Sequence, residues 1–143
     1  MSAEQAPCFV DTNVLVYAFE KGGSPKKETA KRLVTELMDT DRLRLSTQVL
    51  QELFVILTRK AAVDCTGEEA LCVLEDLAAW PLTVVDFPAI RAAAGLAGKA
   101  SLSFWDSLVV ISAAKSGSAV LYTEDLNDGQ EILGVRVTNP FAF

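Results

Sequence analysis

Residues 8–19 read Cys8-Phe-Val-Asp11-Thr-Asn13-Val-Leu-Val-Tyr-Ala-Phe19, and this stretch decides the fold class. Its first three residues form a short apolar run, which predicts a buried strand that ends in front of Asp11. The residues from Asn13 to Phe19 then predict a short helix. A buried strand followed at once by a helix is the repeating unit of a parallel α/β sheet.

The rest of the chain repeats this alternation. Ser24 precedes Pro25 as an N-cap, Asp86 is a further cap, and Thr66 and Ser103 open sequences of the capping-box form. The helices are expected to end near residues 38, 60, 79, 95 and 115. The helix that ends near residue 60 has one apolar face, formed by Leu50, Leu53, Phe54 and Leu57. Further strands are predicted at residues 43–46, 82–85, 119–123 and 135–138. The fold class is therefore α/β with a central parallel sheet.

Length and composition further limit the number of domains and the kinds of catalysis that are possible. The chain has 143 residues, which suits a single domain over residues 1–143. It contains no histidine, which excludes Ser-His-Asp and Cys-His catalysis and every histidine metal site. The three cysteines (Cys8, Cys65 and Cys72) form no CxxC pair, which suits a reducing cytosol. We expect them to be small buried residues of the core, with Cys65 and Cys72 on one helix. With neither an apolar span nor a signal peptide, we expect a cytoplasmic protein without a membrane partner.

The net charge of −6 argues against a nucleic-acid partner when it is taken alone. The charge is unevenly distributed, however. Residues 1–60 hold nine lysines and arginines against eight acids, whereas residues 61–143 hold four against eleven. Cations available for phosphate contacts are Lys26, Lys27, Lys31, Arg32, Arg42, Arg44, Arg59 and Lys60. A solvated basic surface is the simpler interpretation for any one of them.

Four acids stand out from the rest. Asp11 and Asp125 follow predicted strands, at the sheet edge where ligands of parallel α/β proteins gather. Glu52 and Asp106 lie on predicted helices among neighbours that include no lysine or arginine three or four residues away. Burial of a carboxylate without a counter-charge is costly, so a cation should compensate.

Each acid also has a purely structural interpretation. Asp11 would cap the next helix, Asp106 would complete its capping box, Glu52 would lie at a wet helix edge and Asp125 would belong to a turn. Together, the four are better explained as a cluster around Mg²⁺ or Mn²⁺, which prefer oxygen ligands. Such a cluster suits two-metal phosphoryl chemistry and makes an acidic site locally positive.

The motifs that carry these acids resemble the PIN domain family. They are Val10-Asp11-Thr12-Asn13-Val14-Leu15, Gln51-Glu52, Phe104-Trp105-Asp106-Ser107 and Thr123-Glu124-Asp125-Leu126, in this order. The ending from Asp125 through Asn139-Pro140-Phe141 resembles the VapC branch, the toxins of type II toxin–antitoxin pairs. The resemblance covers about residues 8–141, which would form the core of the domain.

The resemblance implies a three-layer α/β/α sandwich and a Mg²⁺- or Mn²⁺-dependent endoribonuclease. Asp11 and Asp106 would be the most direct metal ligands, and Glu52 and Asp125 would hold metal or the attacking water. Asn13 and Thr123 match supporting positions, and Asp128 is a further acid where the family varies. The resemblance also implies RNA hydrolysis to a 5′-phosphate and a 3′-hydroxyl, a homodimer, and inhibition by a VapB-type antitoxin.

Other functions remain open from the sequence. A phosphoacceptor receiver domain needs a lysine after a late strand, where this chain has Glu124-Asp125, and a haloacid-dehalogenase-type phosphatase needs an aspartate at position 13. A PIN domain that binds RNA or protein without cutting, or one that matures RNA without an antitoxin, fits the same motifs. Apolar stripes around Phe54 or at Leu71 and Leu74 are candidate surfaces for an antitoxin segment.

Overall fold

A six-stranded sheet forms the centre of the computed structural model, which describes residues 5–61 and 63–142. Its strand order is β3-β2-β1-β4-β6-β5, and every pairing is parallel except that between β5 and β6. The strands are β1 (Cys8–Val10), β2 (Leu43–Ser46), β3 (Leu82–Thr83), β4 (Val120–Tyr122), β5 (Glu131–Ile132) and β6 (Val135–Thr138). This arrangement confirms the predicted α/β class with a mostly parallel sheet.

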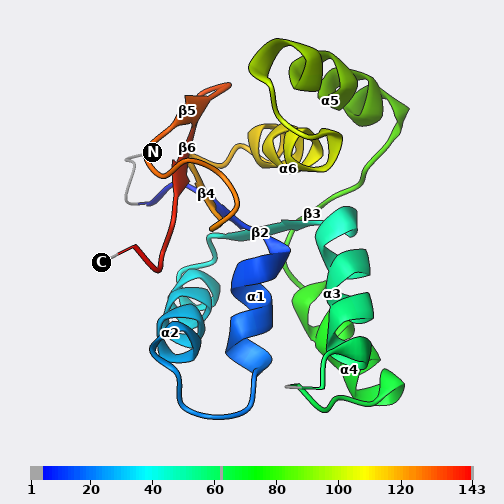
Figure 1. Ribbon diagram of the computed structural model, residues 1–143, viewed down its shortest axis with the longest axis vertical. Coiled ribbons are helices and arrows are strands. Elements are labelled where there is room, and N and C mark those ends of the chain that lie inside the picture. The colour runs from blue at the N-terminus through cyan, green and yellow to red at the C-terminus, as the bar shows by residue number, and fades with distance from the viewer. Residues whose placement is uncertain (1–4, 62, 143) are drawn as a thin grey trace.

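Helices cover both faces of the sheet, as Figure 1 shows. On one side lie α1 (Thr12–Phe19), α2 (Pro25–Asp39), α3 (Thr47–Arg59) and α4 (Gly67–Leu77), and on the other lie α5 (Phe87–Ala100) and α6 (Phe104–Lys115). The three-layer sandwich is therefore present. In the described part of the chain, no helix is both long and apolar enough to cross a membrane.

The central position of β1 explains its uniformly apolar sequence. The strand pairs with β2 on one side and β4 on the other, with Cys8 opposite both Leu43 and Val120. Its residues are buried because helices cover both faces of the strand. As β1, β2 and β4 are parallel, their carboxyl ends meet at one edge of the sheet, and the segments that follow them bring distant residues together.

Helix starts agree with the cap residues in the sequence. The side chains of Ser24, Thr66, Asp86 and Ser103 each accept a hydrogen bond from a backbone N–H in the first turn that follows. Thr66 and Glu69 form both hydrogen bonds of a capping box. At Ser103 only one of the two is present, in which the Ser103 hydroxyl accepts from the Asp106 N–H at 3.0 Å. The carboxylate of Asp106 is thus not used as a cap.

Several predicted boundaries were wrong. The strand expected at residues 82–85 ends at Thr83, and α5 continues past Gly95 to Ala100 because its alanines favour helix enough to offset a glycine penalty of about 1 kcal/mol. The hairpin of β5 and β6 was missed. Its two-residue turn has positive φ at both Leu133 (52°) and Gly134 (78°), and leucine is an unusual residue for such a turn.

Two further expectations need correction. On α3, Leu53 and Leu57 are buried as predicted, but Leu50 is only half-buried and Phe54 is exposed, so the inner face is turned toward Val49. All three cysteines are free, but only Cys8 is a buried filler, and Cys65 precedes α4 instead of lying on it. The helix phase differs because α3 packs on both the sheet and α1, which favours one stripe over the equally apolar neighbouring one.

Candidate active site

One pocket of about 150 Å³ collects the four acids that stood out in the sequence. They reach it from four separate segments: the end of β1, the second turn of α3, the first turn of α6 and the loop after β4. These acids are Asp11, Glu52, Asp106 and Asp125. The parallel sheet edge therefore brings together residues that are as far as 114 positions apart in the chain, counted from Asp11 to Asp125.

Asp11 is the most deeply placed of the four, with 6% of its surface exposed. It is the N-cap of α1, where its Oδ1 accepts a hydrogen bond from the Thr12 N–H at 2.7 Å, and its Oδ2 accepts from the Thr123 hydroxyl at 2.9 Å. Burial raises the pKa of Asp11 to about 6, against the effect of these hydrogen bonds and with a smaller contribution from the Glu52 and Asp125 charges. The cap and site interpretations of Asp11 are thus compatible.

One hydroxyl, that of Thr123, connects the loop after β4 to the start of α1. The buried Thr123 Oγ1 donates to Asp11 and accepts from the Asn13 side-chain amide at 3.3 Å and from the Asp125 backbone N–H at 3.1 Å. One donor and two acceptor positions are all that a hydroxyl offers, so this group is fully used. Thr123 and Asn13 therefore lie beside Asp11 and Asp125, and their supporting role stays a prediction.

The other three acids are more accessible. Asp106 is half-buried at the start of α6, and Glu52 and Asp125 are exposed residues whose side chains line the pocket. Desolvation raises the pKa of Glu52, with smaller additions from the charges of Asp106 and Asp125 and an opposing hydrogen bond from Gln48. In the part of the chain that the structure describes, no lysine or arginine lies within ion-pair distance of any of the four.

Polar atoms without partners point to further participants. Within the described residues, Thr12 Oγ1, Asn13 Oδ1 and Gln48 Oε1 are buried without a hydrogen-bond partner, and all three residues line the pocket. Neither Gln48 nor Thr12 was predicted from the sequence as a site residue. For Gln48 a signal existed, because it lies one helical turn before Glu52 and so on the same face of α3. Buried polar atoms normally have partners, so these three oxygens are free to accept a hydrogen bond from water or a ligand in the pocket.

These residues fit a hard divalent cation. The pocket offers carboxylate, amide and hydroxyl oxygens, the ligand type that Mg²⁺ and Mn²⁺ prefer. Over residues 5–61 and 63–142, no three acids or cysteines are close enough together to form a ready metal site. This spacing is consistent with four negative groups that repel one another and surround a space instead of touching.

Other predicted residues lie outside this pocket. Asp128 Oδ1 accepts a hydrogen bond from the Asn139 N–H at 2.8 Å, which fixes the segment after β6, and the residue does not line the pocket. Among the candidate phosphate-binding cations, Lys26, Lys60 and Arg42 form ion pairs with Glu124, Glu20 and Glu36. Trp105 was not selected from the sequence, yet it lines the pocket and is 65% exposed.

The comparisons with known proteins agree with this architecture. The family model of the PIN domain matches residues 8–127. A toxin–antitoxin complex from Klebsiella pneumoniae contains a chain with a TM-score of 0.70 and 17% identity, over 95% of this chain and 99% of that one. VapC20 from Mycobacterium tuberculosis, described as a sarcin–ricin loop cleaving toxin, has a TM-score of 0.63 and 20% identity, over 80% of this chain and 86% of that one.

A DNA-bound VapBC from Salmonella typhimurium has a TM-score of 0.64 and 21% identity, over 94% of this chain and 98% of that one. At such identities these likenesses show a shared fold over nearly the whole chain. Among curated proteins, none matches the chain in sequence.

Proposed function

Because the chain belongs to the PIN domain family, we propose that it is a Mg²⁺- or Mn²⁺-dependent endoribonuclease that acts as the toxin of a toxin–antitoxin pair. The observation that carries the proposal is the pocket where Asp11, Glu52, Asp106 and Asp125 face one another without a lysine or arginine partner among the described residues. Such a concentration of negative charge is stable only with protons or a cation.

Each acid has a proposed role. Asp11 and Asp106 would be the most direct metal ligands, and Glu52 and Asp125 would complete the site or hold the attacking water. When bound, Mg²⁺ or Mn²⁺ activates water and stabilises the charge that develops on a phosphate. Thr123 and Asn13 would orient Asp11 and Asp125, and the unpartnered Gln48 Oε1 would accept from a water at the pocket.

RNA is the proposed substrate, and its cleavage would leave a 5′-phosphate and a 3′-hydroxyl. With no histidine in the chain, an imidazole pair that activates the 2′-hydroxyl is absent, which favours attack by water. The indole of Trp105 lies exposed at the pocket and offers a face on which an unpaired base can stack. This feature favours a single-stranded segment over a duplex.

The proposed partners are a VapB-type antitoxin and a second copy of the chain. A groove of about 520 Å³ between α3 and α4 is lined by Leu50, Phe54, Val55 and Leu74, and Leu71 is exposed nearby in sequence. An apolar groove of this kind fits an amphipathic segment of an antitoxin. Leu57, which the sequence placed in the same stripe, is buried and unavailable.

Cleavage of RNA by the purified, antitoxin-free protein tests the proposal. We expect cutting with Mg²⁺ or Mn²⁺, none with EDTA, and a loss of more than about 100-fold in Asp106→Asn, because this variant removes a ligand charge. The control Asp76→Asn changes an exposed acid on α4, away from the pocket, and should cut like the wild type.

Three other outcomes would contradict the proposal in different ways. Cutting that persists in Asp106→Asn would indicate a contaminating nuclease. Binding of RNA without cutting would favour the non-cutting module. Cutting of one RNA precursor at a defined site, with no antitoxin gene adjacent, would favour an RNA-maturation nuclease.

A further inference from the structure

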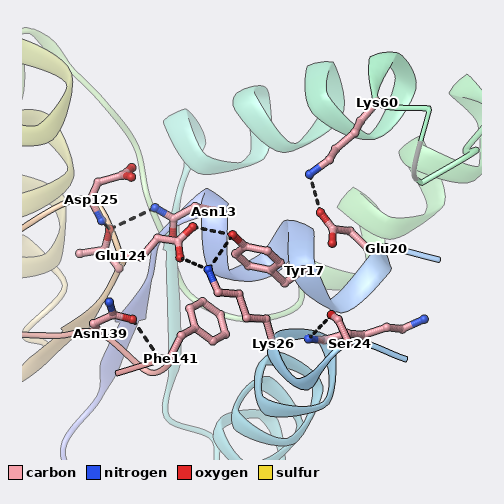
Figure 2. Close-up of polar contacts among 12 residues, drawn as sticks. Asn13, Tyr17, Glu20, Ser24, Lys26, Lys60, Glu124, Asp125, Asn139 and Phe141 are labelled. Carbon is pink, nitrogen blue, oxygen red and sulfur yellow. Dashed lines mark hydrogen bonds and ion pairs between the residues drawn. The ribbon is translucent and has the colours of Figure 1, made fainter. Parts of the chain in front are cut away.

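Beside the carboxylate pocket, three side chains form a closed triangle of hydrogen bonds (Figure 2). The Tyr17 hydroxyl donates to Glu124 Oε1 at 2.8 Å, and the Lys26 ammonium donates to Glu124 Oε2 at 3.1 Å and to the Tyr17 hydroxyl at 3.3 Å. The three residues come from α1, from the first turn of α2 and from the loop after β4. Both oxygens of the Glu124 carboxylate are thus occupied.

Two aromatic rings lie beside the Lys26 ammonium of this triangle. The Lys26 Nζ lies 4.9 Å from the centre of the Tyr17 ring and 5.4 Å from that of Phe141, and the two rings meet edge to face at 4.9 Å. The Glu124 side chain is 22% exposed, whereas the acid of the simple surface pair Lys21–Asp64 is 76% exposed. The Lys26 side chain is 46% exposed, so it is the partial burial of Glu124 and the several simultaneous contacts that make the triangle more rigid than an isolated surface ion pair.

The triangle acts on the segment that carries Asp125. Glu124 lies between Thr123 and Asp125, and α1 holds this segment at two points one helical turn apart. Asn13 donates to the Thr123 hydroxyl, and Tyr17, four residues later on the same face, donates to Glu124. The Asp125 residue itself is exposed, and its bond within this segment is made by its backbone N–H.

We propose that Tyr17, Lys26 and Glu124 are positioning residues that hold the loop after β4 so that the Asp125 carboxylate faces Asp11 across the pocket. This inference rests on the proposed function of that pocket. No member of the triangle is one of the four acids, and none of the three side chains forms a hydrogen bond to them among the described residues. Because Asp11 is the N-cap of α1, the same helix would set the positions of both carboxylates.

Mn²⁺ affinity of the purified full chain, measured by calorimetry without RNA, tests the inference. The main variant is Tyr17→Phe, which removes the hydroxyl but keeps the ring that contacts Lys26 and Phe141. A second variant, Lys26→Met, keeps the apolar stem. The matched control is Lys21→Met, which breaks an ion pair of the same 3.1 Å length that lies on the surface with Asp64.

We expect Tyr17→Phe and Lys26→Met to bind Mn²⁺ about ten-fold more weakly and to lower kcat with little change in the KM for RNA. Lys21→Met should retain wild-type affinity, and melting temperatures measured with EDTA will separate weaker metal binding from a fold defect. If the wild type binds Mn²⁺ and both variants bind it equally well or more tightly, the positioning role is wrong. If the wild type binds no Mn²⁺, the proposed metal site fails together with this inference.

Discussion

Replacing Asp11 with asparagine is expected to abolish metal-dependent RNA cleavage and, at the same time, to stabilise the metal-free protein at pH 8. The residue is buried, carries a charge at that pH and faces the negative charges of Glu52 and Asp125. Asparagine keeps an oxygen for the Thr12 N–H that caps α1, but it removes the buried charge. The site is therefore a place where function costs stability.

The sign of the pH dependence follows from the pKa of Asp11, which is about 6 in the folded protein against a usual value of 3.8. Between these values the folded state binds more protons than the unfolded state, so stability is full below pH 4 and falls as the pH rises through 6. A shift of this size corresponds to about 3 kcal/mol. Because this shift already includes the hydrogen bonds that oppose it, and asparagine resembles the protonated acid, we expect Asp11→Asn to gain about 2–3 kcal/mol at pH 8.

Chemical unfolding of both proteins in EDTA, from pH 4 to pH 8, measures this difference. The stability curves should nearly coincide at pH 4, separate between pH 4 and pH 6, and run parallel above pH 6, with Asp11→Asn the more stable. Asp86→Asn is the matched control with the opposite sign, because the cap of α5 and Lys115 lower the pKa of Asp86. Equal stability of the wild type and Asp11→Asn at every pH would contradict this prediction, because it would show that the buried Asp11 charge does not destabilise the folded protein.

Thr123→Val is expected to have the second largest effect. The substitution leaves the shape of the side chain nearly unchanged and removes the hydroxyl that serves Asp11, Asn13 and the Asp125 N–H. The Asp11 carboxylate then loses one of its two hydrogen bonds while it stays buried. We expect the free energy of unfolding to fall by about 2–3 kcal/mol and RNA cleavage to fall about 100-fold.

Denaturant unfolding and cleavage rates of Thr123→Val are compared with those of Thr123→Ser. Serine keeps the hydroxyl and loses only a methyl group, so this variant should retain the three hydrogen bonds and most of the activity. If serine proves as damaging as valine, packing of the methyl group matters more than the hydroxyl. Normal cleavage by Thr123→Val would remove Thr123 from the site.

Local features of the fold were predictable because their causes are local. Ser24, Thr66 and Ser103 each begin a helix through a bond to the backbone within three residues, so a short window of sequence contains the whole signal. The β5–β6 hairpin was missed because its turn uses Leu133 at positive φ. The stripe on α3 was misplaced because packing against distant elements selects between two apolar faces.

What the sequence by itself determined is the list of acids without basic neighbours and the strands that precede two of them. Residue type and spacing along the chain were enough for that, since a buried strand and a capped helix can be recognised over a few residues. The same information predicted that Asp11 and Asp125 lie at one sheet edge, because parallel strands have their carboxyl ends together.

Only the tertiary structure decided which groups share an environment. The bond between Tyr17 and Glu124 joins residues 107 positions apart, and the unpartnered oxygen of Gln48 is visible only once the start of α6 lies beside α3. The raised pKa of Asp11 likewise depends on its burial and on charges from other segments. Hydrogen bonds, desolvation and Coulomb interactions depend on distance in space, and sequence separation does not measure that distance.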